Sequence, residues 1–259
     1  MRILTSFTLK SVFVTLLVLS MMFSTGPINQ AHAEDPELIN IPGSFSGSFG
    51  IVSEYRYRGL DQSDDHPALQ GSFDWSHEKG YYLGVWASNV DFGDGDQGNT
   101  EFDFYAGVAR EYYGINFDIG VLYYAYPGAN QVLNYDFVEY HIGLGHEWEL
   151  LSLSGSVNYS PQFFGNSGNA TYMSYEAEVP LLQGIGLSAH VGHQWLSNAV
   201  AYGVGGVDQS KDYVDWSIGL GYSTNGFDLN LTYVDTDLTT ADKATGAGDT
   251  VIFGISRSF

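Results

Sequence analysis

The sequence contains no cysteine among its 259 residues. Disulfide frameworks, thiol chemistry and cysteine-ligated zinc are therefore excluded. Basic residues are also scarce, because 9 Lys and Arg stand against 30 Asp and Glu and give a formal net charge of −21 at pH 7. Since nucleic acid is a polyanion that binds basic surfaces, we expect no nucleic-acid partner.

Long apolar runs are missing after the N-terminal region. A membrane-spanning helix needs about 18 consecutive apolar residues, and no segment beyond residue 33 approaches that length. Acidity alone would favour disorder, but 44% of the residues are hydrophobic and 15% are aromatic, with 19 tyrosines. Aromatic residues favour strands and bilayer interfaces. The composition therefore predicts a folded protein rich in β-structure.

The N-terminal region has the three parts of a secretory signal peptide. The first ten residues carry two basic residues and no acid, residues 12–23 are apolar apart from one Thr and one Ser, and residues 31–33 read Ala-His-Ala. The apolar part is too short for a membrane anchor, and the small-x-small triplet is typical of a cleavage site. We expect Sec-type export and removal of residues 1–33 by cleavage near Ala33.

The remaining chain alternates apolar and polar residues with a period of two. In the last segment Val251, Phe253 and Ile255 share one face, and Gly254 and Ser256 lie on the other. This alternation is typical of a strand with one apolar face. Twelve such segments can be counted: 43–58, 68–77, 81–90, 100–112, 115–126, 134–148, 151–160, 170–179, 185–197, 212–222, 227–236 and 251–259.

The connections between these segments alternate in length. Tight turns such as Asn225-Gly226 alternate with long polar connections, predicted at 59–67, 91–99, 127–133, 161–169, 198–211 and 237–249. Tight turns at one rim and long loops at the other are typical of outer-membrane barrels. A soluble sandwich or lipocalin-like barrel is the alternative, but glycine and serine dominate the polar face and fit a crowded lumen better.

We therefore predict an all-β protein, an antiparallel transmembrane β-barrel of about twelve strands over residues 43–259. Residues 34–42 would form a short periplasmic tail. The barrel would lie in the outer membrane of a Gram-negative bacterium, in contact with lipid and lipopolysaccharide. Phe259 ends the last strand on its apolar face, and we expect it to act as an assembly signal for the barrel-assembly machinery.

Aromatic residues cluster near the predicted strand ends. Such rings prefer the headgroup depth of a membrane and would form two girdles. The loop-side girdle would contain Tyr55, Tyr123, Tyr126, Tyr159, Trp195 and Tyr233, and the turn-side girdle Tyr81, Tyr112, Trp148, Tyr222, Phe227 and Phe259.

Motifs in the first half of the chain resemble a known family. They are Tyr-Arg-Tyr-Arg-Gly-Leu-Asp-Gln-Ser at 55–63, Pro67 to Gly71, the run at 80–90, Glu-Phe-Asp-Phe-Tyr-Ala-Gly at 101–107 and Tyr-Tyr-Ala-Tyr-Pro-Gly at 123–128. Together they resemble the TorF family of proteobacterial porins. The match in motifs covers about 45–140. The resemblance implies an outer-membrane barrel with a pore function and names no substrate.

The inward face of the predicted barrel is mainly acidic. The residues that we expect to line a pore are Arg56, Arg58, Asp74, Glu101, Asp103, Glu139, His141 and Glu176. Acids in a lumen raise the local cation concentration and repel anions. Acids facing arginines would also create a transverse field, or they would form salt bridges that simply fill the lumen. Twelve strands lie between the filled and the open size classes of barrel, so strand number does not decide.

These features predict a porin-like channel for passive diffusion of small hydrophilic solutes, with preference for cations. The alternative is a closed barrel whose acidic loops bind a partner protein, a polysaccharide or a divalent ion. Asp91, Asp94 and Asp96 are one such acidic group, but they lack the EF-hand spacing and we interpret them as a solvated loop.

Some barrels of this size are lipid hydrolases, which need a nucleophilic serine beside a histidine. His141 is expected to face Asn158, with Ser156 one step away. No histidine has a clear serine at the same height on a neighbouring strand. We therefore expect no enzyme activity, no metal and no cofactor.

Overall fold

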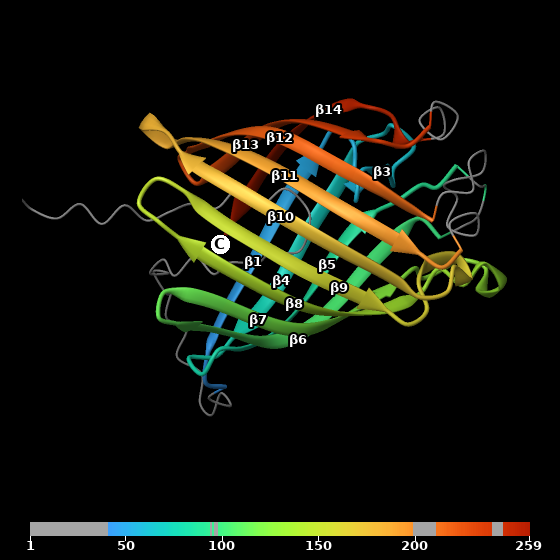
Figure 1. Cartoon of the computed structure of the whole chain (residues 1–259), viewed down its shortest axis with the longest axis horizontal. Coiled ribbons are helices and arrows are strands. Elements are labelled where there is room, and N and C mark those ends of the chain that lie inside the picture. The colour runs from blue at the N-terminus through green and yellow to red at the C-terminus, as the bar shows by residue number, and fades with distance from the viewer. Residues whose placement is uncertain (1–40, 94, 96–97, 199–210, 240–245) are drawn as a thin grey trace, which may run out of the picture.

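Twelve strands form one closed barrel in the part of the chain that the structure, a computed structural model, describes (Figure 1). Every strand pairs antiparallel with its neighbours in sequence, and the last strand pairs with the first to close the barrel. The predicted fold class is thus confirmed. The described residues are 41–93, 95, 98–198, 211–239 and 246–259.

The predicted signal peptide lies outside these residues, so cleavage near Ala33 stays a prediction. No helix among the described residues is long and apolar enough to cross a membrane.

The strand bounds follow the predicted segments closely, with one exception at the first strand. The barrel consists of β1 (Ser44–Val52), β4 (Ala68–Ser76), β5 (Tyr81–Asn89), β6 (Thr100–Tyr112), β7 (Ile115–Ala125), β8 (Phe137–Glu147), β9 (Ser152–Ser160), β10 (Ala170–Pro180), β11 (Ile185–Leu196), β12 (Asp212–Thr224), β13 (Phe227–Thr236) and β14 (Thr250–Ser258). Two short strands, β2 (Arg56–Tyr57) and β3 (Leu60–Asp61), pair with each other away from the barrel sheet. The 3₁₀ turns η1 (Gln131–Leu133), η2 (Phe164–Asn166) and η3 (Leu182–Gly184) lie in connections.

Tight turns lie at one end of the barrel and long connections at the other, as predicted (Figure 1). At two turns, Tyr113-Gly114 and Asn225-Gly226, both residues have positive φ, which is the hairpin geometry that matches the twist of the strands. The long connections therefore all emerge at the same rim. We call the two rims the loop end and the turn end.

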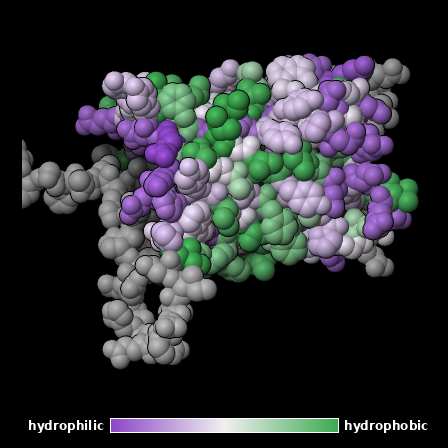
Figure 2. All heavy atoms as spheres, turned by 90° about the horizontal axis from the view of Figure 1, so that it is seen from below, coloured by the Kyte–Doolittle hydropathy of each residue, from purple (hydrophilic) through white to green (hydrophobic). Residues whose placement is uncertain are grey.

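The outer surface carries a broad apolar band between polar ends (Figure 2). Large side chains such as Phe73 and Ile119 are 55% and 62% exposed, which is the reverse of a water-soluble protein. At the turn end, Tyr81, Tyr112 and Phe259 are exposed, as the predicted girdle requires. Because this band covers consecutive strands, the surface matches a hydrocarbon surrounding.

The first strand is shorter than predicted. The alternation suggested a strand over 43–58, but β1 ends at Val52, and the chain leaves the barrel wall after Ser53, which still bonds to Phe253 of β14. Arg58 and Gly59 have positive φ, so the chain reverses there and β2 pairs back onto β3. Tyrosine and arginine alternate at 55–58, and both kinds of side chain are buried or half-buried there. The alternation therefore continues past the end of β1 and could not reveal the break.

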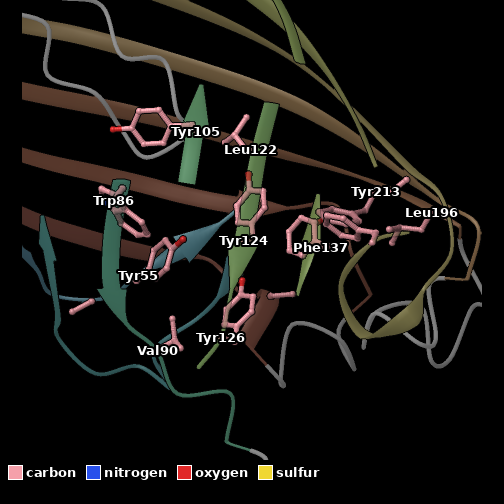
Figure 3. Packing of buried hydrophobic residues seen from close by; sticks show 14 of the residues in the cluster. Tyr55, Trp86, Val90, Tyr105, Leu122, Tyr124, Tyr126, Phe137, Leu196 and Tyr213 are labelled. Atoms are coloured by element: carbon pink, nitrogen blue, oxygen red, sulfur yellow. The ribbon is translucent and has the colours of Figure 1, made fainter. Parts of the chain in front are cut away.

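The prediction that Tyr55 and Tyr126 belong to the loop-side girdle is wrong. Tyr55 is 2% exposed and Tyr126 is 6% exposed, and both are packed inside the barrel near Tyr124 (Figure 3). Their phenol groups lie near buried carboxylates, where burial and the charges of Glu101 and Asp103 raise the pKa of Tyr126. Both residues lie beyond the ends of their strands, so strand parity did not control where their rings point.

Candidate functional site: the lumen of the barrel

Residues 54–63 of the β1–β4 connection are buried or half-buried and lie inside the barrel, and we call them the inner segment. Tyr55 packs edge-on against Trp86 of β5, with ring centres 5.5 Å apart. At the other side, a Cβ added to Gly59 would lie 2.5 Å from Thr236 of β13 and 2.9 Å from Asp215 of β12. Since its contacts reach opposite walls, the inner segment crosses the lumen.

Arg58 is the main link between the inner segment and the far wall. Its Nη2 lies 2.6 Å from Oε2 of Glu139 on β8, and its Nη1 donates to Oε1 of Gln194 on β11 at 2.7 Å. The guanidinium carbon lies 4.2 Å from the ring centre of Tyr172 on β10 and 5.6 Å from that of Phe163. The guanidinium is thus held by polar and aromatic groups together.

Both charged partners are almost fully enclosed, with side chains 2% and 1% exposed for Arg58 and Glu139. Burial lowers the pKa of Arg58, but the Glu139 carboxylate raises it, and the net pKa is well above the ordinary value. The guanidinium therefore stays charged. Loss of either partner would leave the other charge buried without compensation.

Arg56 contacts other residues of the inner segment and one residue of the β13–β14 connection. Its guanidinium contacts the Glu54 carboxylate and donates to the carbonyl oxygens of Gly59 and Gly246. The sequence placed both arginines on the inward face of a strand. The structure places them in the lumen, but on the inner segment.

Three predicted acids, Glu101, Asp103 and Glu139, are buried on β6 and β8 and are 1%, 3% and 1% exposed. Tyr124 donates a hydrogen bond to Glu139 at 3.1 Å. Within the described residues, one carboxylate oxygen of each acid has no hydrogen-bond partner, and the only Lys or Arg paired with any of them is Arg58. This side of the lumen therefore has more acid than base.

The other predicted residues lie in the lumen but in separate groups. Asp74 on β4 accepts hydrogen bonds from Tyr105 and from Ser72. His141 Nε2 lies 3.2 Å from Asp118 Oδ2. Glu176 Oε1 lies 3.7 Å from Nδ1 of His190.

Sequence reasoning gave no role to three residues that organise this lumen. Gln194 and Tyr172 hold Arg58, as described above. His190 Nε2 lies 3.0 Å from Oδ1 of Asp215 and 3.0 Å from the Tyr172 hydroxyl. All three residues lie on the inward parity of their strands, so parity located them, but no pattern in one strand shows which residues meet across a barrel.

A cavity of about 90 Å³ lies between the inner segment and the wall formed by β10 to β13. One water takes up about 30 Å³ of liquid, so the space suits a few waters or a small solute. Its lining combines Glu54 and Arg58 of the inner segment with Glu178, Asp215 and Thr232 of the wall. The lumen is therefore narrowed by the inner segment but is not completely filled.

An aromatic cluster joins three of the long connections at the loop end. Phe92 lies 5.7 Å from Tyr126 and 5.3 Å from Phe164, and Tyr135 stacks on Phe164 with ring centres 4.3 Å apart. These residues come from the β5–β6, β7–β8 and β9–β10 connections. We call them the loop-end cluster. It packs these three connections against one another at the loop end.

The groups considered for enzyme and metal chemistry have structural partners. His141 faces Asn158 across β8 and β9, as predicted, and among the described residues no serine hydroxyl is hydrogen-bonded to a histidine. Glu54, Asp61 and Asp65 bring carboxylate oxygens within 4.8 Å of one another, but Glu54 contacts Arg56 and Asp61 accepts backbone hydrogen bonds of its own loop. Asp94 and Asp96 lie outside the described residues.

The geometry is that of a closed, antiparallel twelve-stranded barrel with an apolar outer band. Residues 39–259 match a family described as a bacterial protein of unknown function (Gcw_chp), and the chain belongs to this family. No curated protein matches the sequence.

Among solved structures, the KdgM porin is similar with a TM-score of 0.54 at 6% identity, covering 83% of this chain and 98% of that one. The KdgM porin in complex with disordered oligogalacturonate has a TM-score of 0.53 at 5% identity, with the same coverage. The COG4313 outer membrane channel from Pseudomonas putida F1 has a TM-score of 0.49 at 10% identity, covering 89% and 100%. At these identities the likeness shows the fold alone.

Proposed function

We propose that this protein is an outer-membrane porin-like channel for passive diffusion of small hydrophilic solutes, with preference for cations. The observation that carries the proposal is a closed barrel with an apolar outer band and a charged lumen that still holds a cavity. The motifs at 45–140 that resemble the TorF porins support a pore, and so does the fold shared with the KdgM porin.

The charges of the lumen support the preference for cations. Arg56 and Arg58 each contact a carboxylate, so neither offers a free positive charge to an anion. Glu101 and Asp103 have no Lys or Arg partner among the described residues. The carboxyl groups of the described lumen therefore outnumber its arginines, and an acidic lumen attracts cations and repels anions.

The acidic lumen does not suit the ligand found in one of the similar structures. Oligogalacturonate, which one KdgM structure contains, is a chain of acidic sugars. A polyanion would meet the repulsion of buried carboxylates here, so we propose a different solute for this chain. The narrow space beside the inner segment favours solutes of a few heavy atoms.

A closed barrel that binds a ligand at its outer loops is the second candidate. The observation in its favour is the loop-end cluster together with the inner segment, which both occupy the entrance from the loop end. In either case we propose an outer-membrane location, contacts with lipid and lipopolysaccharide, and no enzyme activity.

Liposome swelling distinguishes the two candidates. Mature protein, residues 34–259, is folded in detergent and reconstituted into liposomes, which are then diluted into isosmotic solutions of glycerol, a pentose or a trisaccharide. We expect swelling with glycerol and much slower swelling with the trisaccharide. No swelling with any solute, from protein shown to be folded, would reject the channel and favour the closed barrel.

A further inference from the structure

The wall of the barrel contains a site shaped for a guanidinium group, which the Arg58 side chain now occupies. The groups that contact this guanidinium, apart from its neighbour Tyr57, are Glu139, Gln194, Tyr172 and Phe163. Three of these come from β8, β11 and β10, and Phe163 comes from the β9–β10 connection. The site is therefore built by the barrel wall and by one connection, independently of the inner segment.

The chemistry of these four residues is selective for a flat, charged donor. A carboxylate and an amide oxygen accept from two different nitrogens, at 2.6 and 2.7 Å, and an aromatic ring lies 4.2 Å from the central carbon. A guanidinium satisfies all of these contacts at once because its donors lie in a rigid plane that also stacks on rings. A compact ammonium cannot donate in two fixed directions and stack in the same pose.

The occupant is attached by a short and strained piece of chain. Arg58 has a φ of +50°, which is rare for a residue with a side chain, and Gly59 follows with a φ of +80°. The hairpin that carries Arg58 has only two paired residues in each strand, joining Arg56 with Asp61 and Tyr57 with Leu60. The contacts of the guanidinium thus hold a backbone conformation that would otherwise be unfavourable.

The surroundings also favour a positive charge in this site when Arg58 is absent. Glu101 and Asp103 are buried within the same side of the lumen, and both act electrostatically on Tyr55 of the inner segment. If Arg58 withdrew, the Glu139 carboxylate would be buried without its cation, and a cation from solution would relieve this charge.

We propose that this wall site binds small guanidinium compounds, and that Arg58 is a tethered occupant that competes with them. The proposal rests on the proposed function only in that the ligand must reach the lumen. Binding of the ligand and release of the inner segment would then be linked, because the two guanidinium groups cannot occupy one site.

The test is binding of methylguanidinium to detergent-folded mature protein, measured by isothermal titration calorimetry. Arg58→Ala vacates the site, so we expect saturable binding of one methylguanidinium per barrel. The wild type should bind about tenfold more weakly or worse, since Arg58 occupies the site most of the time. Arg58→Ala combined with Glu139→Gln should lose the binding. Lys79→Ala, which removes a positive charge from a turn-end loop, should behave like the wild type.

Heat-modifiable migration shows whether each variant is folded. Should Arg58→Ala fail to fold, Arg58→Gly, which tolerates the positive φ, is refolded with and without methylguanidinium. The ligand should restore folding by compensating Glu139, and no rescue overturns the proposal. A folded Arg58 variant that does not bind methylguanidinium overturns the proposal. Binding that survives Glu139→Gln overturns it too, and so does equal affinity for methylammonium. A folded barrel without conductance would reject the channel. The binding experiment would still test the guanidinium site, because it does not measure conductance.

Discussion

Arg58 and Glu139 form the buried ion pair on which the arrangement of the lumen depends most. Arg58→Ala leaves the Glu139 carboxylate enclosed without its cation, and we expect a loss of about 3–5 kcal/mol in the free energy of unfolding. Urea titration in lipid vesicles, followed by tryptophan fluorescence, measures this loss. Adding Glu139→Gln to Arg58→Ala should recover part of the lost stability. If the double variant is no more stable than Arg58→Ala alone, the pair does not act as described.

Glu101 and Asp103 are the residues that we expect to set ion preference. The double change Glu101→Gln and Asp103→Asn removes two buried carboxyl groups and changes little volume, so the K⁺ over Cl⁻ preference should fall. The measurement is the shift of reversal potential across a KCl gradient. The control is Glu78→Gln, which neutralises an exposed acid in a turn. An equal shift in the control would show that general surface charge, and not this pair, decides preference.

Single residues show how far the sequence could be interpreted. Strand parity placed Glu101, Asp103 and Glu139 inside the barrel, because a period of two assigns every second side chain to the lumen. Parity could not pair Arg58 with Glu139, since the two residues are 81 positions apart and meet only through the curvature of the barrel. It also failed for Tyr55, because the chain had already left the wall.

At the scale of elements, Phe259 follows β14 directly and extends the β1–β14 seam that closes the barrel. The N–H and C=O groups of Phe259 pair with those of Gly47 at 3.0 and 2.9 Å, and the ring is 70% exposed on the outer surface. Deleting Phe259 removes the last pair of the β1–β14 seam and an aromatic terminus. We expect less inserted barrel in cells, measured by membrane fractionation and heat-modifiable migration. Normal levels of folded protein after the deletion would contradict an assembly role.

The loop-end cluster should behave as one unit. Phe164 stacks on Tyr135 and contacts Phe92, so Phe164→Ala removes rings from the centre of three connections. We expect faster chymotrypsin cleavage in the β7–β8 connection, residues 126–136, while the strands stay protected. Leu150→Ala, at an exposed turn of the opposite end, is the matched control. Unchanged cleavage after Phe164→Ala would mean that the connections are held by other contacts.

Most of the elements could be predicted because each strand is short, alternating and bounded by turn residues. The residues of β6 and β13 fall where the alternation placed them. The inner segment could not be predicted, because its own alternation of tyrosine and arginine imitates the end of a strand. Its position depends on contacts with Trp86 of β5, Gln194 of β11 and Asp215 of β12, which are far from it in the sequence.

For the whole molecule, the outer surface and the lumen differ in polarity. Apolar side chains cover the outside, and acids, hydroxyls and tyrosines cover the inside. This inversion follows from a solvent of lipid around the barrel and water within it. In the channel that we propose, the inner segment would set the width of the path, because it narrows a lumen that twelve strands would otherwise leave partly open.

The most direct test of the central claim is the current through the mature wild-type protein in a planar bilayer with a KCl gradient. We predict stepwise conductance and a reversal potential of the sign that indicates K⁺ permeation over Cl⁻. Reversal of the opposite sign would leave the pore and contradict the acidic lumen as its filter. Folded barrels that insert and give no steps would contradict the channel itself.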